Sequence, residues 1–219
     1  MEFKFIMTTQ ISNGVNYETL ANTEAIQKAI KTLAERGIEA IVVSNRVEAL
    51  EKVKSLIPKG ASVMNGSSRT LEEIGFVDYL KSGNHGWKNL HEEILKEKDP
   101  EKQAILGKQA VHSDYYLGSI HAVAETGQLV IASNSGSQLP HIVFTSSNLI
   151  FVVGVQKIAP NLDAAIARVR EYVLPLEDQR MKSVGMGGSF VSKLLIFEKE
   201  QPFMNRKVYV IFVNEKLGF

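Results

Sequence analysis

The stretch GIEAIVVSNRVEALEKVKSLIPKGASVMNG, residues 37–66, decides the fold class. Its apolar run at residues 38–44 is rich in isoleucine and valine and predicts a buried strand. Residues 45–60 have the spacing of an amphipathic helix that a proline and a glycine bring to an end, and residues 61–66 predict a second short strand. This order of strand, helix and strand predicts an α/β protein with a Rossmann-like, mostly parallel sheet covered by helices.

Helix and strand patterns continue on both sides of this stretch. Apolar residues recur at three- and four-residue steps from Leu20 to Leu33, which predicts a helical N-terminal portion ending at Gly37. The most hydrophobic run, residues 148–158, predicts a central strand, and the short spacing around the apolar run at 127–133 predicts a hairpin. The remaining predictions are a strand at 114–119, a surface helical segment at 84–109 broken near Pro100, a helix at 161–175 ended by Pro175, a glycine-rich loop at 176–189, and strands at 193–200 and 207–215.

Composition excludes several classes of function. The 219 residues include 25 basic and 24 acidic side chains, a net charge of +1, which gives no reason to expect a nucleic-acid partner. The chain has no cysteine. Disulfides, thiolate catalysis, cysteine-ligated zinc and iron–sulfur clusters held by the chain itself are therefore excluded.

The sequence shows no segment that addresses the chain to a membrane. The first residues have too short an apolar run for a secretory signal, and no window approaches the ~18 apolar residues of a membrane helix. A cytoplasmic protein without membrane contact is expected, with an N-terminal segment at residues 1–24 and one α/β domain at residues 25–219. Self-association as a homo-oligomer is left open.

The first candidate site is the turn NGSSRT, residues 65–70. It follows a predicted strand and precedes a predicted helix, which is where open α/β sheets bind ligands. Backbone N–H groups at a helix start favour anions, Gly66 permits close approach, and Ser67, Ser68 and Thr70 supply hydroxyls. Asn65 ends the strand. An ordinary capped turn, with Thr70 and Glu73 as a capping box or a serine as the cap, is the alternative.

The second candidate is Glu125, a lone carboxylate beside Gly127 in AETGQLV. It could act as a nucleophile, a general base or a hydrogen-bond acceptor, or simply bond to the backbone of a turn. His121 lies four residues earlier, a spacing that places both side chains on one face of a helix or strand and would let them share a proton. Core packing is the alternative for His121.

The histidines and the glycine-rich segment are two further candidate patterns. The five histidines lack the spacing of a metal site, so no metal is predicted. Gly185, Gly187 and Gly188 could expose N–H groups as an anion nest or could only provide flexibility. A serine hydrolase is not indicated, because Ser119 does not lie in a GxSxG nucleophile elbow.

The segments DYYLGSIHAV, AETGQLV, FVVGVQKIAPNLDAAIARVR and VIFVNEKLGF, together with NGSSRTLEEIG, closely resemble the lactate-utilisation (LUD) domain family. The resemblance runs from about Ala25 to Phe219. The family's fold is similar to that of ribose-5-phosphate isomerase and the CoA transferases. The resemblance therefore implies a Rossmann-like sheet with a ligand at the strand ends.

The resemblance also implies a function and partners. Family members resemble components of a system that oxidises L-lactate to pyruvate, in which other subunits carry iron–sulfur chemistry. Some relatives have cysteines near the position of MKSVGMGGSF, whereas this chain has none. Any cluster therefore belongs to a partner subunit or is absent, and the identity of a cofactor stays unknown.

The resemblance completes the set of expected site residues. In the related CoA transferases a Glu in a Glu-x-Gly turn attacks an acyl-CoA, and Glu125 with Gly127 matches that turn. A small anionic metabolite would be held by NGSSRT and by Asn134, Ser135 and Gly136 of SNSGS, with Ser119 as a further binding residue. Lys157 is a candidate charge partner or a solvated lysine at a strand end.

Three functions remain open at this point. The first is a LUD-type component of lactate utilisation that binds a small anion. The second is a stand-alone acyl-CoA or sugar-phosphate enzyme that uses Glu125, and the third is a non-enzymatic regulatory or structural subunit.

Overall fold

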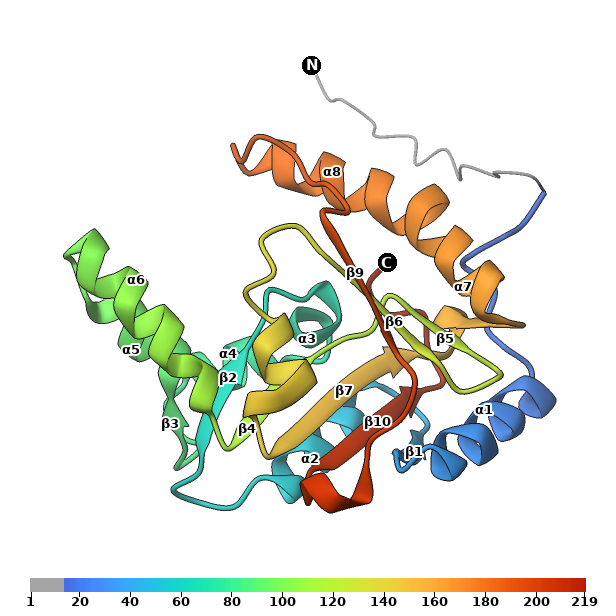
Figure 1. Ribbon diagram of the computed structural model, residues 1–219, viewed down its shortest axis with the longest axis horizontal. Coiled ribbons are helices and arrows are strands. Elements are labelled where there is room, and N and C mark those ends of the chain that lie inside the picture. Colours follow the sequence, from blue (N-terminus) through green and yellow to red (C-terminus); the bar gives the residue numbers. More distant parts are fainter. Residues whose placement is uncertain (1–13) are drawn as a thin grey trace.

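Two β-sheets form the centre of the molecule in the computed structural model, which describes residues 14–219 (Figure 1). The larger sheet has six strands, all parallel, in the order β1, β10, β7, β4, β2, β3. The strands of this sheet are β1 (Glu39–Val43), β10 (Lys207–Val213), β7 (Asn148–Gly154), β4 (Tyr115–Gly118), β2 (Ser62–Asn65) and β3 (Lys88–Asn89). The α/β class with a parallel sheet is therefore confirmed.

The smaller sheet was not predicted as a separate unit. It has four strands in the order β8 (Ile158–Ala159), β5 (Ala122–Ala124), β6 (Leu129–Ser133) and β9 (Lys193–Phe197). Strands β5 and β6 form the predicted hairpin, and β9 adds to β6 in the antiparallel direction. The predicted strand at 148–158 is divided between the two sheets, because the chain makes a 3-10 turn at Val155–Lys157 between β7 and β8.

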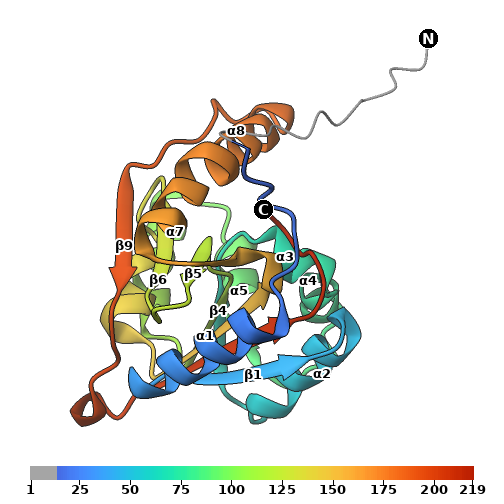
Figure 2. The ribbon, with the colours of Figure 1, turned by 90° about the vertical axis from the view of Figure 1, so that its right-hand side faces the viewer.

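The helices cover the sheets in layers (Figure 2). Helices α2, α3 and α4 pack on one face of the large sheet, whereas α1 and the small sheet pack on the other face. Helix α7 covers the far side of the small sheet. The helix bounds are α1 (Thr23–Glu35), α2 (Arg46–Leu56), α3 (Arg69–Glu73), α4 (Phe76–Lys81), α5 (Leu90–Lys96), α6 (Pro100–Gln109), α7 (Leu162–Arg168) and α8 (Leu174–Ser183).

The central strands supply both cores of the large sheet. In β7, Phe151 and Val153 face α1 and the small sheet, whereas Ile150 and Val152 face α2–α4. This alternation follows from the two-residue repeat of a strand, and all four side chains are inaccessible to solvent. Trp87 belongs to the core on the α2–α4 side, where its indole N–H donates a hydrogen bond to the Ile57 carbonyl.

Local sequence signals account for several helix ends. The side chain of Asn22 accepts a hydrogen bond from the backbone of Ala25 at the start of α1, and Gly37, with φ of +72°, follows its C-terminal end. Asp99 caps α6 and Pro100 stands in its first turn, so the surface segment is indeed broken there.

The structure decides one open prediction and overturns another. The serine cap of α3 is confirmed, because the Ser68 hydroxyl accepts a hydrogen bond from the Leu71 N–H, whereas the capping box at Thr70 does not form. Pro175 does not end a helix, because a π-helical turn at Val169–Val173 precedes it and α8 continues to Ser183. A π-turn leaves a carbonyl without its usual partner, so a proline can follow without a further loss of hydrogen bonding.

The N-terminal boundary predicted at residue 24 stays a prediction, and its residues 1–13 lie outside the described part of the chain. Within residues 14–219, every helix is too short or too polar to cross a bilayer.

Candidate functional site

A cavity of about 380 Å³ lies at the carboxyl ends of the central strands. Its lining comes from the turn after β2, the end of β4, the segment after β6, the 3-10 turn after β7, and α8 with the loop that follows it. This edge is where a parallel sheet is expected to bind ligands. Segments separated by more than a hundred residues in sequence therefore meet at one cavity.

Lys157 places a buried amine at this cavity. Its side chain is almost fully buried, and Nζ donates hydrogen bonds to Thr70 Oγ1 at 3.1 Å and Ser119 Oγ at 3.2 Å. Both acceptors are neutral, and no ion pair forms between Lys157 and any residue from 14 to 219. Burial, and secondly the charge of Arg168, lowers the pKa of Lys157 from 10.5 to about 7. The cavity therefore holds a buried amine that an anion would stabilise in its charged form.

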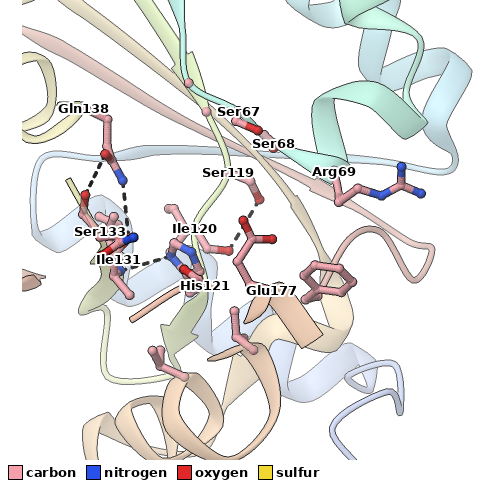
Figure 3. Close-up of a pocket in the computed structure, with 18 of the residues that line it drawn as sticks. Ser67, Ser68, Arg69, Ser119, Ile120, His121, Ile131, Ser133, Gln138 and Glu177 are labelled. Carbon is pink, nitrogen blue, oxygen red and sulfur yellow. Dashed lines mark hydrogen bonds between the residues drawn. The ribbon is translucent and has the colours of Figure 1, made fainter. Parts of the chain in front are cut away.

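The turn after β2 approaches the cavity closely because of Gly66. A Cβ at this position would lie 2.6 Å from Tyr116 Oη, so any larger residue would displace the turn or the ring. Ser67 and Ser68 follow and line the cavity, with Ser68 engaged in capping α3 (Figure 3). The hydroxyl of Thr70 is buried and donates to the Leu217 carbonyl at 3.4 Å while it accepts from Lys157.

His121 is a neutral imidazole at the cavity wall. Its Nδ1 accepts a hydrogen bond of 3.2 Å from the Ala132 N–H, which assigns the ring proton to Nε2. Its main-chain carbonyl accepts a bond of 2.6 Å from Arg168, which is itself buried. Burial, with the charges of Lys157 and Arg168, lowers the pKa of His121 to about 3. His121 is therefore a hydrogen-bond donor at neutral pH and does not gain a charge.

Helix α8 contributes a charged pair on the opposite side. Arg180 donates two hydrogen bonds to the Glu177 carboxylate, at 2.7 and 2.6 Å, and a longer one of 3.4 Å to Ser67 Oγ. Figure 3 shows Glu177, Ser67 and Ser119 around the same cavity. Arg69 also lines the cavity and pairs with Glu72. The side chains of the lining thus include three basic groups and one carboxylate. Arg69 and Arg180 are paired with acidic side chains, so Lys157 is the basic group of the lining that has no ion pair among residues 14–219.

Comparisons with known proteins decide the family. The sequence profile of the LUD domain matches residues 26–213, which is most of the chain. The chain belongs to the LUD domain family. A crystal structure of a DUF162 family protein from Deinococcus radiodurans is similar to this LUD domain with a TM-score of 0.55 and 12% identity, over 90% of this chain and 100% of that chain. This likeness shows the fold alone. No curated protein matches the chain significantly.

Most of the predicted binding residues of this LUD domain converge on the cavity. The predicted residues that line it are Gly66, Ser67, Ser68, Thr70, Ser119, His121, Asn134, Ser135 and Lys157. Lys157 lies in the 3-10 turn after β7 and is not a solvated lysine at a strand end. Asn65 is buried at the end of β2 and donates to the Gly66 carbonyl, and Gly136 binds Ser133 through its N–H, so both support the lining without reaching the cavity surface.

The structure does not bring Glu125 to the cavity. Glu125 follows β5 in the hairpin turn, where its carboxylate pairs with Lys28 of α1 at 2.9 Å and its carbonyl accepts from Thr32 Oγ1. The prediction that Glu125 and Gly127 share one cavity with NGSSRT is therefore wrong, as is the proton shared with His121. The physical reason is that His121 and Glu125 stand at opposite ends of β5, so their side chains bond to different elements.

Several lining residues of the LUD domain were missed from sequence. Glu177 and Arg180 fall in the segment that was predicted as a loop after Pro175, although their three-residue spacing is typical of a helical ion pair. Ser133 and Gln138 bond to each other at 2.8 Å and shape the loop after β6 (Figure 3). No local pattern identifies this second pair, because its role depends on the packing of two sheets.

The glycine-rich loop of the LUD domain closes back on α8. The N–H groups of Gly185 and Gly188 donate to the carbonyls of Lys182 and Met186, so two of the three expected anion-binding groups are already used. Met186 and Ser189 of this loop line the cavity. Among residues 14–219, histidine and acidic side chains form no cluster of three that could hold a metal ion.

Proposed function

We propose that this LUD domain binds a small organic anion at Lys157 and acts in L-lactate utilisation together with partner subunits. The observation that carries the proposal is the buried amine of Lys157, which faces a cavity and whose hydrogen-bond partners among residues 14–219 are two neutral hydroxyls. A buried charge without a counter-ion is costly, and a bound carboxylate or phosphate would remove that cost.

The surrounding groups support an anion rather than a cation. Thr70 and Ser119 fix the position of Nζ, and the Nε2–H of His121 is a neutral donor at the same cavity. Membership of the LUD family supports lactate or pyruvate as the first anions to test. Because the chain has no cysteine, any iron–sulfur cluster that takes part in the oxidation of lactate would belong to a partner subunit.

The alternative enzyme that uses Glu125 covalently is not supported. Glu125 is absent from the cavity lining and is paired with Lys28 at the surface of α1.

The decisive experiment is calorimetric titration of the protein with L-lactate, pyruvate and inorganic phosphate, using the variant Lys157→Met. This change keeps the length of the apolar stem and removes the charge. We expect the affinity for the best anion to fall at least ~10-fold, or about 1.4 kcal/mol. Removal of an unpaired buried charge should not lower the free energy of unfolding at pH 7, so the loss would not reflect misfolding.

The matched control is Lys28→Met, which removes one positive charge from a side chain that is 54% exposed and lies outside the cavity. Its anion affinity should equal that of the unmodified protein. Equal affinities in the Lys157→Met variant and the control would overturn the proposal.

A further inference from the structure

The cavity has two walls of different chemistry. On the sheet side the lining is polar, with the serine-rich turn after β2, Ser119, His121 and Lys157. On the helix side the lining is mainly apolar, with Val169, Val173, Leu174 and Met181 from the continuous helical segment that ends in α8. Figures 1 and 2 show this helical segment lying across from the ends of the central strands. A ligand that fills the cavity therefore meets charge at one end and hydrocarbon at the other.

The rim of the cavity extends the apolar wall. Met186 and Phe190, in the loop after α8, line the cavity and yet are 56% and 66% exposed. A ligand that contacts these two large apolar side chains would be stabilised, because the contact removes apolar surface from water. Two polar residues, Glu177 and Arg180, also lie on the helix-side wall. They are paired with each other, so the wall stays mainly apolar.

The volume of the cavity also indicates a ligand larger than lactate or pyruvate. At about 380 Å³ it falls within the range of roughly 300–1,000 Å³ that is typical of pockets for drug-sized ligands. Lactate or pyruvate would occupy the end near Lys157 and leave the apolar wall in contact with water.

We infer that the preferred ligand is an amphipathic acid, whose carboxylate lies at Lys157 and whose aromatic or branched apolar body lies along Val173 and Phe190. This inference rests on the proposed function, since it uses the same anion site. It adds the ligand class: the same site binds lactate or pyruvate, and binds a 2-hydroxy or 2-oxo acid with a large apolar side chain more tightly.

The test compares L-lactate with L-phenyllactate, which share the hydroxy-acid head and differ by a phenyl ring. Calorimetric titration of the full chain should give at least ~10-fold tighter binding of phenyllactate, since the ring buries apolar surface against the helix-side wall. Equal or weaker binding of phenyllactate would overturn the inference and leave anion binding at Lys157 intact. Saturable binding of neither acid would instead remove the proposed function on which it rests.

Two variants locate the ring. Phe190→Ser should weaken phenyllactate at least ~3-fold and leave lactate unchanged, whereas Phe203→Ser is the matched control, because Phe203 is also exposed, at 77%, and lies outside the cavity. Val173→Ala is the second variant, on the buried part of the wall, and should act in the same direction. If both cavity variants bind phenyllactate as the control does, the ring lies elsewhere and the inference is wrong.

Discussion

Lys157 is the residue whose protonation should set the pH range of anion binding. Its folded-state pKa of about 7 lies below its ordinary value of 10.5, so between these values the unfolded chain holds more protons than the folded one. Stability should therefore rise with pH from about 7 to 10.5, whereas the affinity for an anion should fall as pH rises through about 7. Anion binding should raise the pKa of Lys157 and take up protons from buffer.

The measurement is titration with phosphate or pyruvate at pH 8 in two buffers of different ionisation enthalpy. We expect uptake of roughly one proton per anion in the unmodified protein and none in Lys157→Met. His121 does not contribute above pH 5, because its pKa is lowered to about 3 and it stays neutral. Proton uptake that persists in the Lys157→Met variant would assign the titration to another group.

Unlike Lys157, Glu125 is not expected to affect anion binding. Because its partner Lys28 is 54% exposed, the Glu125→Gln change should cost at most ~1 kcal/mol in the free energy of unfolding and should leave anion affinity unchanged. Urea unfolding and calorimetric titration measure the two quantities. A loss of binding of ~10-fold or more would return Glu125 to the site.

For single residues, the sequence predicts which polar side chains lie near strand ends better than it predicts which groups those side chains contact. The hydroxyls of the serine-rich turn and Lys157 were identified because they follow apolar runs, and they do line the cavity. Glu125 was misplaced because a carboxylate beside a glycine turn has the same local pattern whether it faces a cavity or a neighbouring helix.

Among the elements, the hairpin between β5 and β6 is held to α1 by a glycine. Gly127 has φ of +93°, and a Cβ there would lie 2.6 Å from Arg36 Cδ and 3.0 Å from the Thr32 carbonyl oxygen. Arg36 also donates a hydrogen bond to the Thr126 carbonyl. The turn and the helix therefore fit together only without a side chain at this position.

Substitution of Gly127 by alanine should lower the free energy of unfolding by about 3 kcal/mol, from the positive φ and the clash together. Gly60→Ala is the matched control, because Gly60 also has a positive φ, +84°, but has nothing within 4 Å of the added Cβ. Its cost should be only about 1 kcal/mol. Urea unfolding of both variants measures the difference, and equal costs would show that the contact with α1 is not tight.

Element ends were predictable where one residue determines them and were not where two signals compete. Gly37 and Pro100 mark the ends that they predict. Pro175 does not, because the π-turn before it accommodates the ring, and helical periodicity alone does not predict a π-turn. The error hid Glu177 and Arg180, since both lie beyond the expected helix end.

For the whole molecule, the parallel order of strands and helices was predictable from alternating apolar periods, whereas the division into two sheets was not. The strands β9 and β10 are neighbours in sequence but pair in different sheets, β9 with β6 and β10 with β1 and β7. Such pairing depends on contacts across most of the chain, which a local pattern does not contain. The cavity also depends on such long-range contacts, because its walls come from both sheets and from α8.

The position of Trp87 has a practical consequence for optical measurements. The chain's single tryptophan is buried beside Phe76 and Tyr79 in the α2–α4 layer, and none of these three residues lines the cavity. Its emission therefore monitors the loss of tertiary structure in that layer and is insensitive to direct quenching by a molecule in the cavity. Ligand binding would be seen in fluorescence only as a shift of the melting curve.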